Sequence, residues 1–205
     1  MFIPSKNIES FSGKLILAVP SEGCIGQRAV DSILSDEGNN FEFYGSFDAT
    51  SIQPMVGRVE NGRVVTCMEL FFSPTTEIGL VQLRAPPLSN SSFCAEFIPW
   101  FRASGFEKLI LLAGVQCSFP LPQVVVVSPE DHENVQYITE DFLNSSIRRA
   151  GFSKKMVAQL NSVDLIMSPN IADLSHILRT CSSLYKVKCA DALSLEKLSV
   201  QDSVY

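Results

Sequence analysis

The chain has 205 residues, of which 46% are hydrophobic, and its formal net charge is −6 at pH 7. This length and apolar content suit a single globular domain and exclude a disordered or low-complexity protein. The acidic balance argues against a nucleic-acid-binding surface, which normally needs a basic face. No apolar run reaches the roughly 18 residues of a membrane span, and the N-terminus lacks the features of a secretion signal. We therefore expect an intracellular protein without a membrane partner.

Residues 15–34 carry the clearest structural signal in the sequence. Residues 15–19 form an unbroken apolar run, which is typical of a strand covered on both faces, and Pro20 ends it because proline has no N–H to donate. Gly23 and Gly26 follow, and apolar side chains then recur at helical spacing up to Leu34. A buried strand joined to a helix by a glycine-containing turn predicts the first half of a βαβ unit.

Strands and helices alternate along the rest of the chain. Ser91 or Ser92 is expected to cap a helix that ends at Gly105, and Pro99 should kink this helix because one backbone hydrogen bond is lost. Asn61-Gly62 predicts a hairpin turn. The apolar patterns predict strands at 41–47, 64–72, 78–84, 108–113, 124–127 and 184–189, and helices at 139–150, 154–160 and 193–198, with one more helix capped by Asn170.

These elements predict a single α/β domain with three layers, in which helices cover both faces of a mixed sheet. An antiparallel hairpin interrupts the alternation near residues 41–84. We expect the α/β/α domain to cover residues 1–199 and residues 200–205 to form a flexible tail.

The turn from Gly23 to Gly26 is the first candidate for chemistry, because a glycine turn at a helix N-terminus gathers backbone N–H groups that can hold phosphate. The turn lacks the lysine of a P-loop and the glycine spacing of a dinucleotide-binding fold. Glu22 adds a negative charge that would repel phosphate, and Arg28 is the nearest basic residue. A plain connection between a strand and a helix explains this segment better than a phosphate site.

Nucleophilic and metal chemistry have little support in the sequence. Cys24 lies at a helix N-terminus, where thiol pKa values fall, but its base would have to be His132 or His176, and both fit solvent-exposed positions. The acidic residues at 130–133 are adjacent and cannot all face one metal ion. The six cysteines lie far apart without a CxxC pair, so they fit small buried hydrophobes. We therefore expect a binding or scaffolding protein without catalytic residues, metal or cofactor.

Several short segments, found in the same order across residues 1–115, resemble the proteasome assembly chaperone 2 family. They are Met1-Phe2-Ile3-Pro4, Gly26-Gln27 with Ala29 and Asp31, Pro54-Met55-Val56-Gly57, Val81-Gln82-Leu83-Arg84, Phe93-Cys94, Trp100, Ser104-Gly105 and Leu109-Ile110-Leu111-Leu112. Their common order and spacing carry the resemblance, since each segment is mostly structural. We assign structural roles to Gly23, Gly26, Gln27, Asp31, Pro54 and Gly57.

The resemblance implies a phosphorylase-like α/β/α fold without enzymatic activity. It also implies a cytoplasmic and nuclear heterodimer with proteasome assembly chaperone 1, which holds the α-subunits while the α-ring of the 20S proteasome is built. A sheet edge or the helix after Gly26 is expected to contribute to this heterodimer. The same fold hosts nucleoside phosphorylases and related hydrolases, so such an enzyme is one alternative, and a diverged adaptor with unrelated partners is another.

The C-terminus carries a second implied binding element. The wider chaperone group can end in a hydrophobic–Tyr–any-residue motif that enters pockets between α-subunits, whereas this chain ends in Val204-Tyr205. Val204 and Tyr205 are expected either to dock there in a shifted register or to form a frayed terminus. Residues 164–173 also depart from the family, because they lack its glycine-rich segment.

Overall fold

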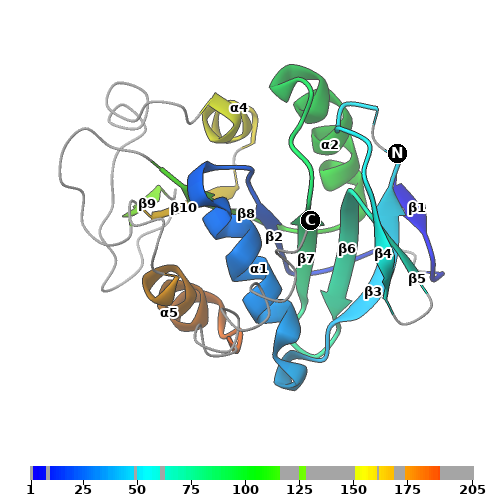
Figure 1. Ribbon diagram of the computed structural model, residues 1–205. Helices are drawn as coiled ribbons and strands as arrows, with labels where there is room; N and C mark the ends of the chain where they lie inside the picture. Colours follow the sequence, from blue (N-terminus) through cyan, green and yellow to red (C-terminus); the bar gives the residue numbers. More distant parts are fainter. Residues whose placement is uncertain are drawn as a thin grey trace.

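An eight-stranded mixed sheet runs through the middle of the computed structural model, with its strands in the order β1-β3-β6-β7-β2-β8-β10-β9 (Figure 1). The structure describes residues 2–7, 10–48, 50–60, 63–115, 125–127, 151–160, 162–168 and 174–189. The strands of this sheet are β1 (Phe2–Pro4), β2 (Lys14–Ala18), β3 (Glu42–Phe47), β6 (Met68–Ser73), β7 (Ile78–Leu83), β8 (Lys108–Gly114), β9 (Val125–Val127) and β10 (Val163–Ser168).

The four inner strands β7, β2, β8 and β10 are parallel to one another. The strands β6, β3 and β1 continue the sheet in antiparallel fashion on one side, and β9 does so on the other. The predicted strand at 15–19 is β2, whose Leu15–Ala18 segment is fully buried. Parallel strands are covered on both faces, which explains the apolar runs Leu15–Ala18 of β2 and Leu109–Ala113 of β8.

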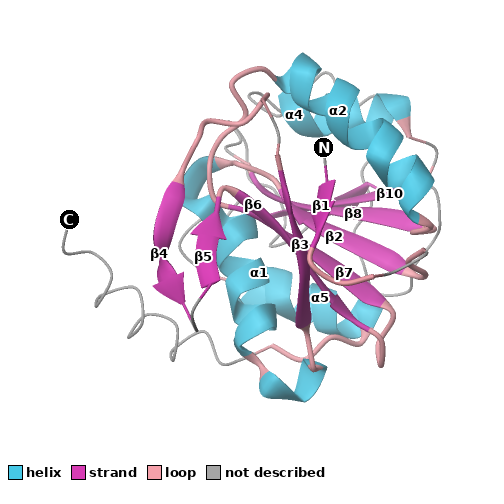
Figure 2. Cartoon of the chain, turned by 90° about the vertical axis from the view of Figure 1, so that its right-hand side faces the viewer, coloured by secondary structure: helices cyan, strands magenta, loops and turns pink. Residues whose placement is uncertain are grey.

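Helices cover both faces of the sheet and make the three layers that the sequence predicts. The helices α1 (Ile25–Ser35) and α5 (Ser175–Tyr185) lie on one face, and α2 (Asn90–Ser104) and α4 (Gly151–Gln159) lie on the other (Figures 1 and 2). Alternate residues of β2 enter the two cores, with Leu15 and Leu17 on the α2 side and Ile16 and Ala18 on the α1 side. None of the described helices is long and apolar enough to cross a membrane.

A separate two-stranded sheet forms the predicted hairpin. Its strands β4 (Val56–Glu60) and β5 (Arg63–Thr66) are antiparallel, and Glu60 lies opposite Arg63. The Asn61-Gly62 pair between them lies outside the described residues. The predicted strand at 64–72 is therefore two strands, since β5 belongs to the hairpin and β6 to the main sheet.

Helix boundaries differ from the prediction in several places. The cap of α2 is Ser89 rather than Ser91 or Ser92, because the Ser89 hydroxyl accepts a hydrogen bond from the Ser92 N–H at 3.3 Å. Gly105 ends α2 as expected, with a left-handed φ of 95°. The helix predicted at 154–160 begins earlier, at Gly151. The predicted helices at 139–150 and 193–198 and the Asn170 cap lie outside the described residues.

Two sheet assignments near the C-terminus are wrong. The predicted strand at 184–189 is instead the end of α5, followed by Lys186 in left-handed conformation and a segment that packs Val187 into the core. The strand β10, which the sequence did not predict, occupies the region that lacks the family's glycines. The apolar run of β10 is interrupted by Asp164. A carboxylate argues against a buried strand unless its partners in space are known.

Candidate functional site

The Gly23–Gly26 turn is fixed by close packing against β8. A Cβ atom on Gly26 would lie 2.3 Å from the carbonyl oxygen of Leu112. The same oxygen accepts a hydrogen bond from the Val19 N–H at 2.9 Å, and the Ser21 hydroxyl accepts one from the Gly114 N–H at 2.7 Å. Only glycine lets α1 begin this close to β8. This contact accounts for Gly26 by packing, without a bound phosphate.

The structure places the candidate nucleophile and one of its two candidate bases on different elements. Cys24 is exposed in the short 3₁₀ helix η1 (Glu22–Cys24), and His176 lies in the first turn of α5. His132 and the acidic residues at 130–133 lie outside the described residues. Among the residues that the structure describes, no group of three or more His, Cys, Asp or Glu side chains is placed to hold a metal ion.

Most of the described cysteines are small packing residues. Cys94 and Cys181 are buried, and Cys67 and Cys189 are partly buried. Burial raises the pKa of Cys94 and of Cys181, and it raises the pKa of Cys189 to about 11. These thiols therefore stay protonated near neutral pH, which makes them poor nucleophiles and poor metal ligands.

Two of the family-like segments meet at the carboxyl end of β7. Gln82 of β7 donates a hydrogen bond from Nε2 to Oδ1 of Asp31 on α1, and Arg84 Nη1 lies 4.0 Å from the same oxygen. Glu69 of β6 is fully buried directly opposite Gln82, and its Oε1 accepts a hydrogen bond from the Thr66 N–H at 2.9 Å. The sequence indicated the segments but not this contact, because nothing in it fixes the pairing of residues 51 positions apart.

These groups lie where one side of α1 meets β6 and β7, a region that we call the α1 flank. It consists of the stripe of α1 residues that faces β7 and the residues of β6 and β7 beside it. Its members are Gln27, Asp31 and Leu34 from α1, Glu69 and Phe71 from β6, and Gln82 from β7. The carboxyl ends of parallel strands are where α/β proteins most often bind ligands.

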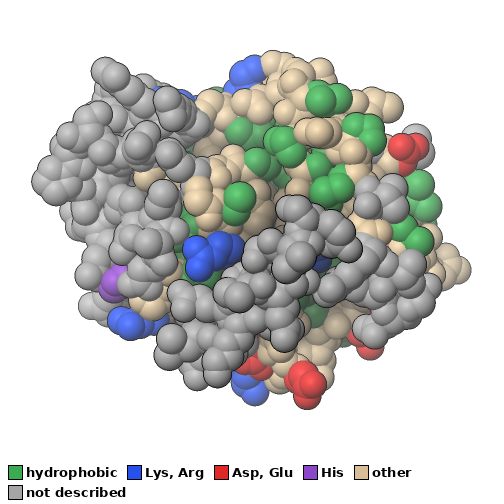
Figure 3. Space-filling view, viewed as in Figure 1, with side chains coloured by type: hydrophobic (Ala, Val, Ile, Leu, Met, Phe, Trp, Pro, Cys, Tyr) green, Lys and Arg blue, Asp and Glu red, His purple; other side chains and the backbone are tan. Residues whose placement is uncertain are grey.

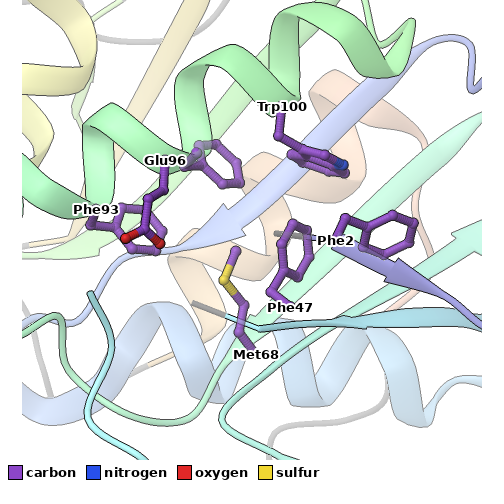
Figure 4. Close-up of a pocket in the computed structure, with 7 residues that line it drawn as sticks. Phe2, Phe47, Met68, Phe93, Glu96 and Trp100 are labelled. Atoms are coloured by element: carbon purple, nitrogen blue, oxygen red, sulfur yellow. The ribbon is translucent and has the colours of Figure 1, made fainter. Parts of the chain in front are cut away.

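The N-terminal segment anchors an aromatic cluster on the opposite face. The Phe2 ring lies 5.0 Å from Phe47 and 5.6 Å from Trp100, measured between ring centroids. Phe2, Phe47, Met68, Phe93, Glu96, Phe97 and Trp100 line a small cavity here (Figure 4). The cavity measures about 20 Å³, which is room for about one water molecule, so it does not hold a substrate.

A second surface, which we call the apolar rim, lies at the end of β7. It is formed by residues 51–55 and 85–88, which run side by side because the Leu88 N–H donates to Ser51 O at 2.8 Å and the Gln53 N–H donates to Pro86 O at 3.2 Å. Leu88 is 66% exposed and Met55 is 38% exposed. Figure 3 shows hydrophobic side chains on the side of the molecule that carries α2 and β1. Leu88 and Met55 therefore leave apolar surface open to solvent at this end of the sheet.

A buried ion pair lies at the amino ends of β8 and β10, and Tyr185 of α5 is hydrogen-bonded to it. Lys108 Nζ lies 3.0 Å from Oδ2 of Asp164, and the Tyr185 hydroxyl donates to the same oxygen at 2.8 Å. Lys14 Nζ lies 5.2 Å from the centroid of the Tyr185 ring. This cluster is structural, since Asp164 is fully buried.

Val204 and Tyr205 lie outside the described residues.

The fold defines a three-layer α/β/α protein. The model of the PAC2 family matches residues 15–196. The chain therefore belongs to the PAC2 family.

Relatives of known name agree with this membership. The chain is 28% identical over 131 residues to proteasome assembly chaperone 2 of Nematostella vectensis, which covers 58% of this chain and 54% of that protein. It is 29% identical over 124 residues to proteasome assembly chaperone 2 of Bos taurus, which covers 55% of this chain and 46% of that protein. The chain spans about half the length of the curated relatives it matches.

Solved structures share the fold at low sequence identity. Pyrococcus furiosus PbaA, an archaeal homolog of proteasome-assembly chaperone, matches with a TM-score of 0.68 and 16% identity over 95% of this chain and 90% of that chain. Pyrococcus furiosus PbaB, an archaeal proteasome activator, matches with a TM-score of 0.66 and 14% identity over 98% of this chain and 95% of that chain. These likenesses confirm the fold class.

Proposed function

We propose that this protein is a proteasome assembly chaperone that acts by binding, without catalysis. The observation that carries the proposal is its membership of the PAC2 family together with relatives named proteasome assembly chaperone 2.

The proposed partners are a companion subunit that resembles proteasome assembly chaperone 1 and the α-subunits of the 20S proteasome. The companion would form a heterodimer with this chain, and the pair would hold α-subunits in order while the α-ring is built. The apolar rim supports a partner-binding role, because Leu88 and Met55 are exposed on two segments that backbone hydrogen bonds join. Preorganised apolar surface lowers the entropic cost of association.

The acidic charge of the chain bears on how fast these partners meet. A net charge of −6 would steer the protein toward basic patches on α-subunits and raise the association rate. The association rate should then fall as salt rises, because screening shortens the range of the attraction. A rate that does not change between about 0.05 and 0.5 M salt would contradict this part.

We place the protein in the cytoplasm and nucleus, which cell fractionation would test.

Affinity purification of the full chain at its native level, followed by mass spectrometry, tests the proposal. We expect a second α/β chaperone and proteasome α-subunits to co-elute without mature β-subunits. Elution alone or with unrelated partners would refute the chaperone role, and saturable binding of inorganic phosphate or nucleosides would favour the enzyme alternative. Removal of Val204 and Tyr205 should then lower α-subunit recovery if these residues dock, and should leave it unchanged if they are frayed.

A further inference from the structure

The outer face of α2 has an unusual composition for the solvent-facing side of a helix. Among the 15 residues of α2, only Glu96 and Arg102 are charged. The middle of the exposed face consists of Ala95, Pro99 and Ala103, which recur every four residues and therefore form one strip along the helix. A surface helix normally carries charged residues opposite its apolar face, and a helix that is apolar on both sides is normally buried. The outer face of α2 therefore has the composition of a surface that another protein covers.

The two charged side chains of α2 make hydrogen bonds only to neutral groups within the described part of the chain. The two oxygens of Glu96 accept from the Thr50 hydroxyl at 2.9 Å and from the Ser51 hydroxyl at 3.0 Å. Arg102 Nη2 donates to the Gln159 carbonyl oxygen at 2.9 Å. These bonds hold both groups in place and leave them room for more, because a carboxylate oxygen can accept more than one hydrogen bond and a guanidinium carries several N–H groups.

Glu96 and Arg102 are placed symmetrically about Pro99. Each lies three residues from Pro99, about 4.5 Å along the helix axis. They lie on opposite sides of the exposed strip, because three residues fall about 60° short of a full helical turn. A two-fold axis through Pro99, perpendicular to the helix, would therefore place Glu96 of one copy against Arg102 of the other. The same axis would place Ala95 against Ala103, so the face is complementary to itself in charge and in size.

We propose that the outer face of α2 binds a second copy of this chain, with the two helices antiparallel and a two-fold axis at Pro99. Two Glu96–Arg102 ion pairs, one on each side of the axis, fix the direction of the helices, because a parallel arrangement separates these charges. The short side chains of Ala95 and Ala103 let the helix axes approach to roughly 8–10 Å. One helix pair is a small contact, so we expect a weak dimer with a Kd of roughly 10–100 µM. The dimer does not depend on the function proposed above, because it follows from the residues of α2.

Cysteine crosslinking of the purified full chain tests the position of the axis. In a background that carries Cys24→Ser and Cys117→Ser, the Pro99→Cys variant should form a disulfide-linked dimer under a mild oxidant, because a residue on the axis faces its own copy. The matched control is Ser92→Cys on the same exposed face. Its two copies would lie about 20 Å apart, beyond the roughly 7 Å between Cα atoms that a disulfide can span. We expect Pro99→Cys to crosslink at least about tenfold faster than Ser92→Cys and than the background.

Charge reversal tests the ion pairs by sedimentation equilibrium, without added cysteines. The Arg102→Glu variant should raise the dimer Kd at least about tenfold, because both attractions become repulsions. The double variant Glu96→Arg with Arg102→Glu restores opposite charges and should bring the Kd to within about threefold of the parent protein. The control Arg179→Glu makes the same charge change at an exposed position of α5 and should leave the Kd within about twofold.

Three results would overturn the α2 dimer. They are equal crosslinking of Pro99→Cys and Ser92→Cys, a chain that stays monomeric at about 1 mM, and a dimer that Arg102→Glu does not weaken. A dimer that Arg102→Glu weakens but the double variant does not restore would overturn the ion pairs. Thermal melts check that every variant folds, and crosslinking and charge reversal each decide the case without the other. The chaperone function is decided separately, by co-purification of proteasome α-subunits.

Discussion

Replacing Asp164 by alanine should destabilise this protein more than most single substitutions. Asp164 lies in β10, is fully buried, and accepts from both Lys108 and Tyr185. The variant removes the carboxylate but leaves the Lys108 ammonium, whose side chain is only 8% exposed, in the interior. A buried charge without its counter-charge is far more costly than the absence of both charges.

The expected magnitude follows from this geometry. Breaking a buried ion pair by removing one partner costs about 3–5 kcal/mol, a large part of the roughly 5–15 kcal/mol by which proteins are stable. For a chain of this length the melting temperature falls by roughly 2–4 °C per kcal/mol, so we expect a drop of roughly 6–20 °C. The double variant Lys108→Met with Asp164→Leu removes both charges and should stay within about 2 kcal/mol of the parent protein.

Urea denaturation followed by far-UV circular dichroism measures both variants. Glu107→Ala is the matched control, because Glu107 is the exposed neighbour of Lys108 and its loss should change the free energy of unfolding by less than about 0.5 kcal/mol. The reasoning is refuted if Asp164→Ala loses less than about 1 kcal/mol. It is equally refuted if the double variant is as unstable as the single one, since the cost would then come from lost packing rather than from an uncompensated charge.

Three further predictions concern packing and thiol exposure. Gly26→Ala should lower the free energy of unfolding by about 1–3 kcal/mol through backbone overlap, whereas Gly151→Ala, whose Cβ would lie at an ordinary contact distance of 3.8 Å from Asn90 Nδ2, should be neutral or slightly stabilising; equal melting curves for the two would contradict the packing argument. Phe2→Ala should cost about 1–3 kcal/mol in urea titrations, because its ring contacts three other aromatic rings, and an unchanged midpoint would mean that the N-terminal strand adds no stability. Iodoacetamide at pH 8 should label the exposed Cys24 in the folded protein but not Cys181, whose pKa is raised by burial; peptide mapping that finds Cys181 labelled first would show that α5 opens.

The strands that the sequence predicted well are those whose apolar runs have no polar interruption. The segments at 15–19 and 108–113 are buried on both faces, so their composition alone indicates their place in the sheet. Residues 184–189 show the limit of this reasoning, because apolar side chains there enter the core from the end of a helix and the segment after it. The strand β10 shows the opposite error, since Asp164 is tolerated inside the sheet through its pairing with Lys108 and its hydrogen bond from Tyr185.

The candidate binding surfaces could be predicted less well than the fold. The segments that contain Gln27, Asp31 and Gln82 stood out in the sequence, but their contact depends on how α1 crosses β7. The burial of Glu69 depends in turn on the antiparallel register that sets it opposite Gln82. Neither relation leaves a periodic signal, because each joins residues far apart in the chain.

The sequence by itself determined the class of fold and the membership in a family. Apolar periodicity and turn residues are local properties, and they indicate buried parallel strands, covering helices and the hairpin without reference to distant residues. Only the tertiary structure decided which polar groups meet. The Gln82–Asp31 contact and the Lys108–Asp164 pair arise from strand order and helix placement, and a buried polar side chain can be interpreted only when its neighbours in space are known.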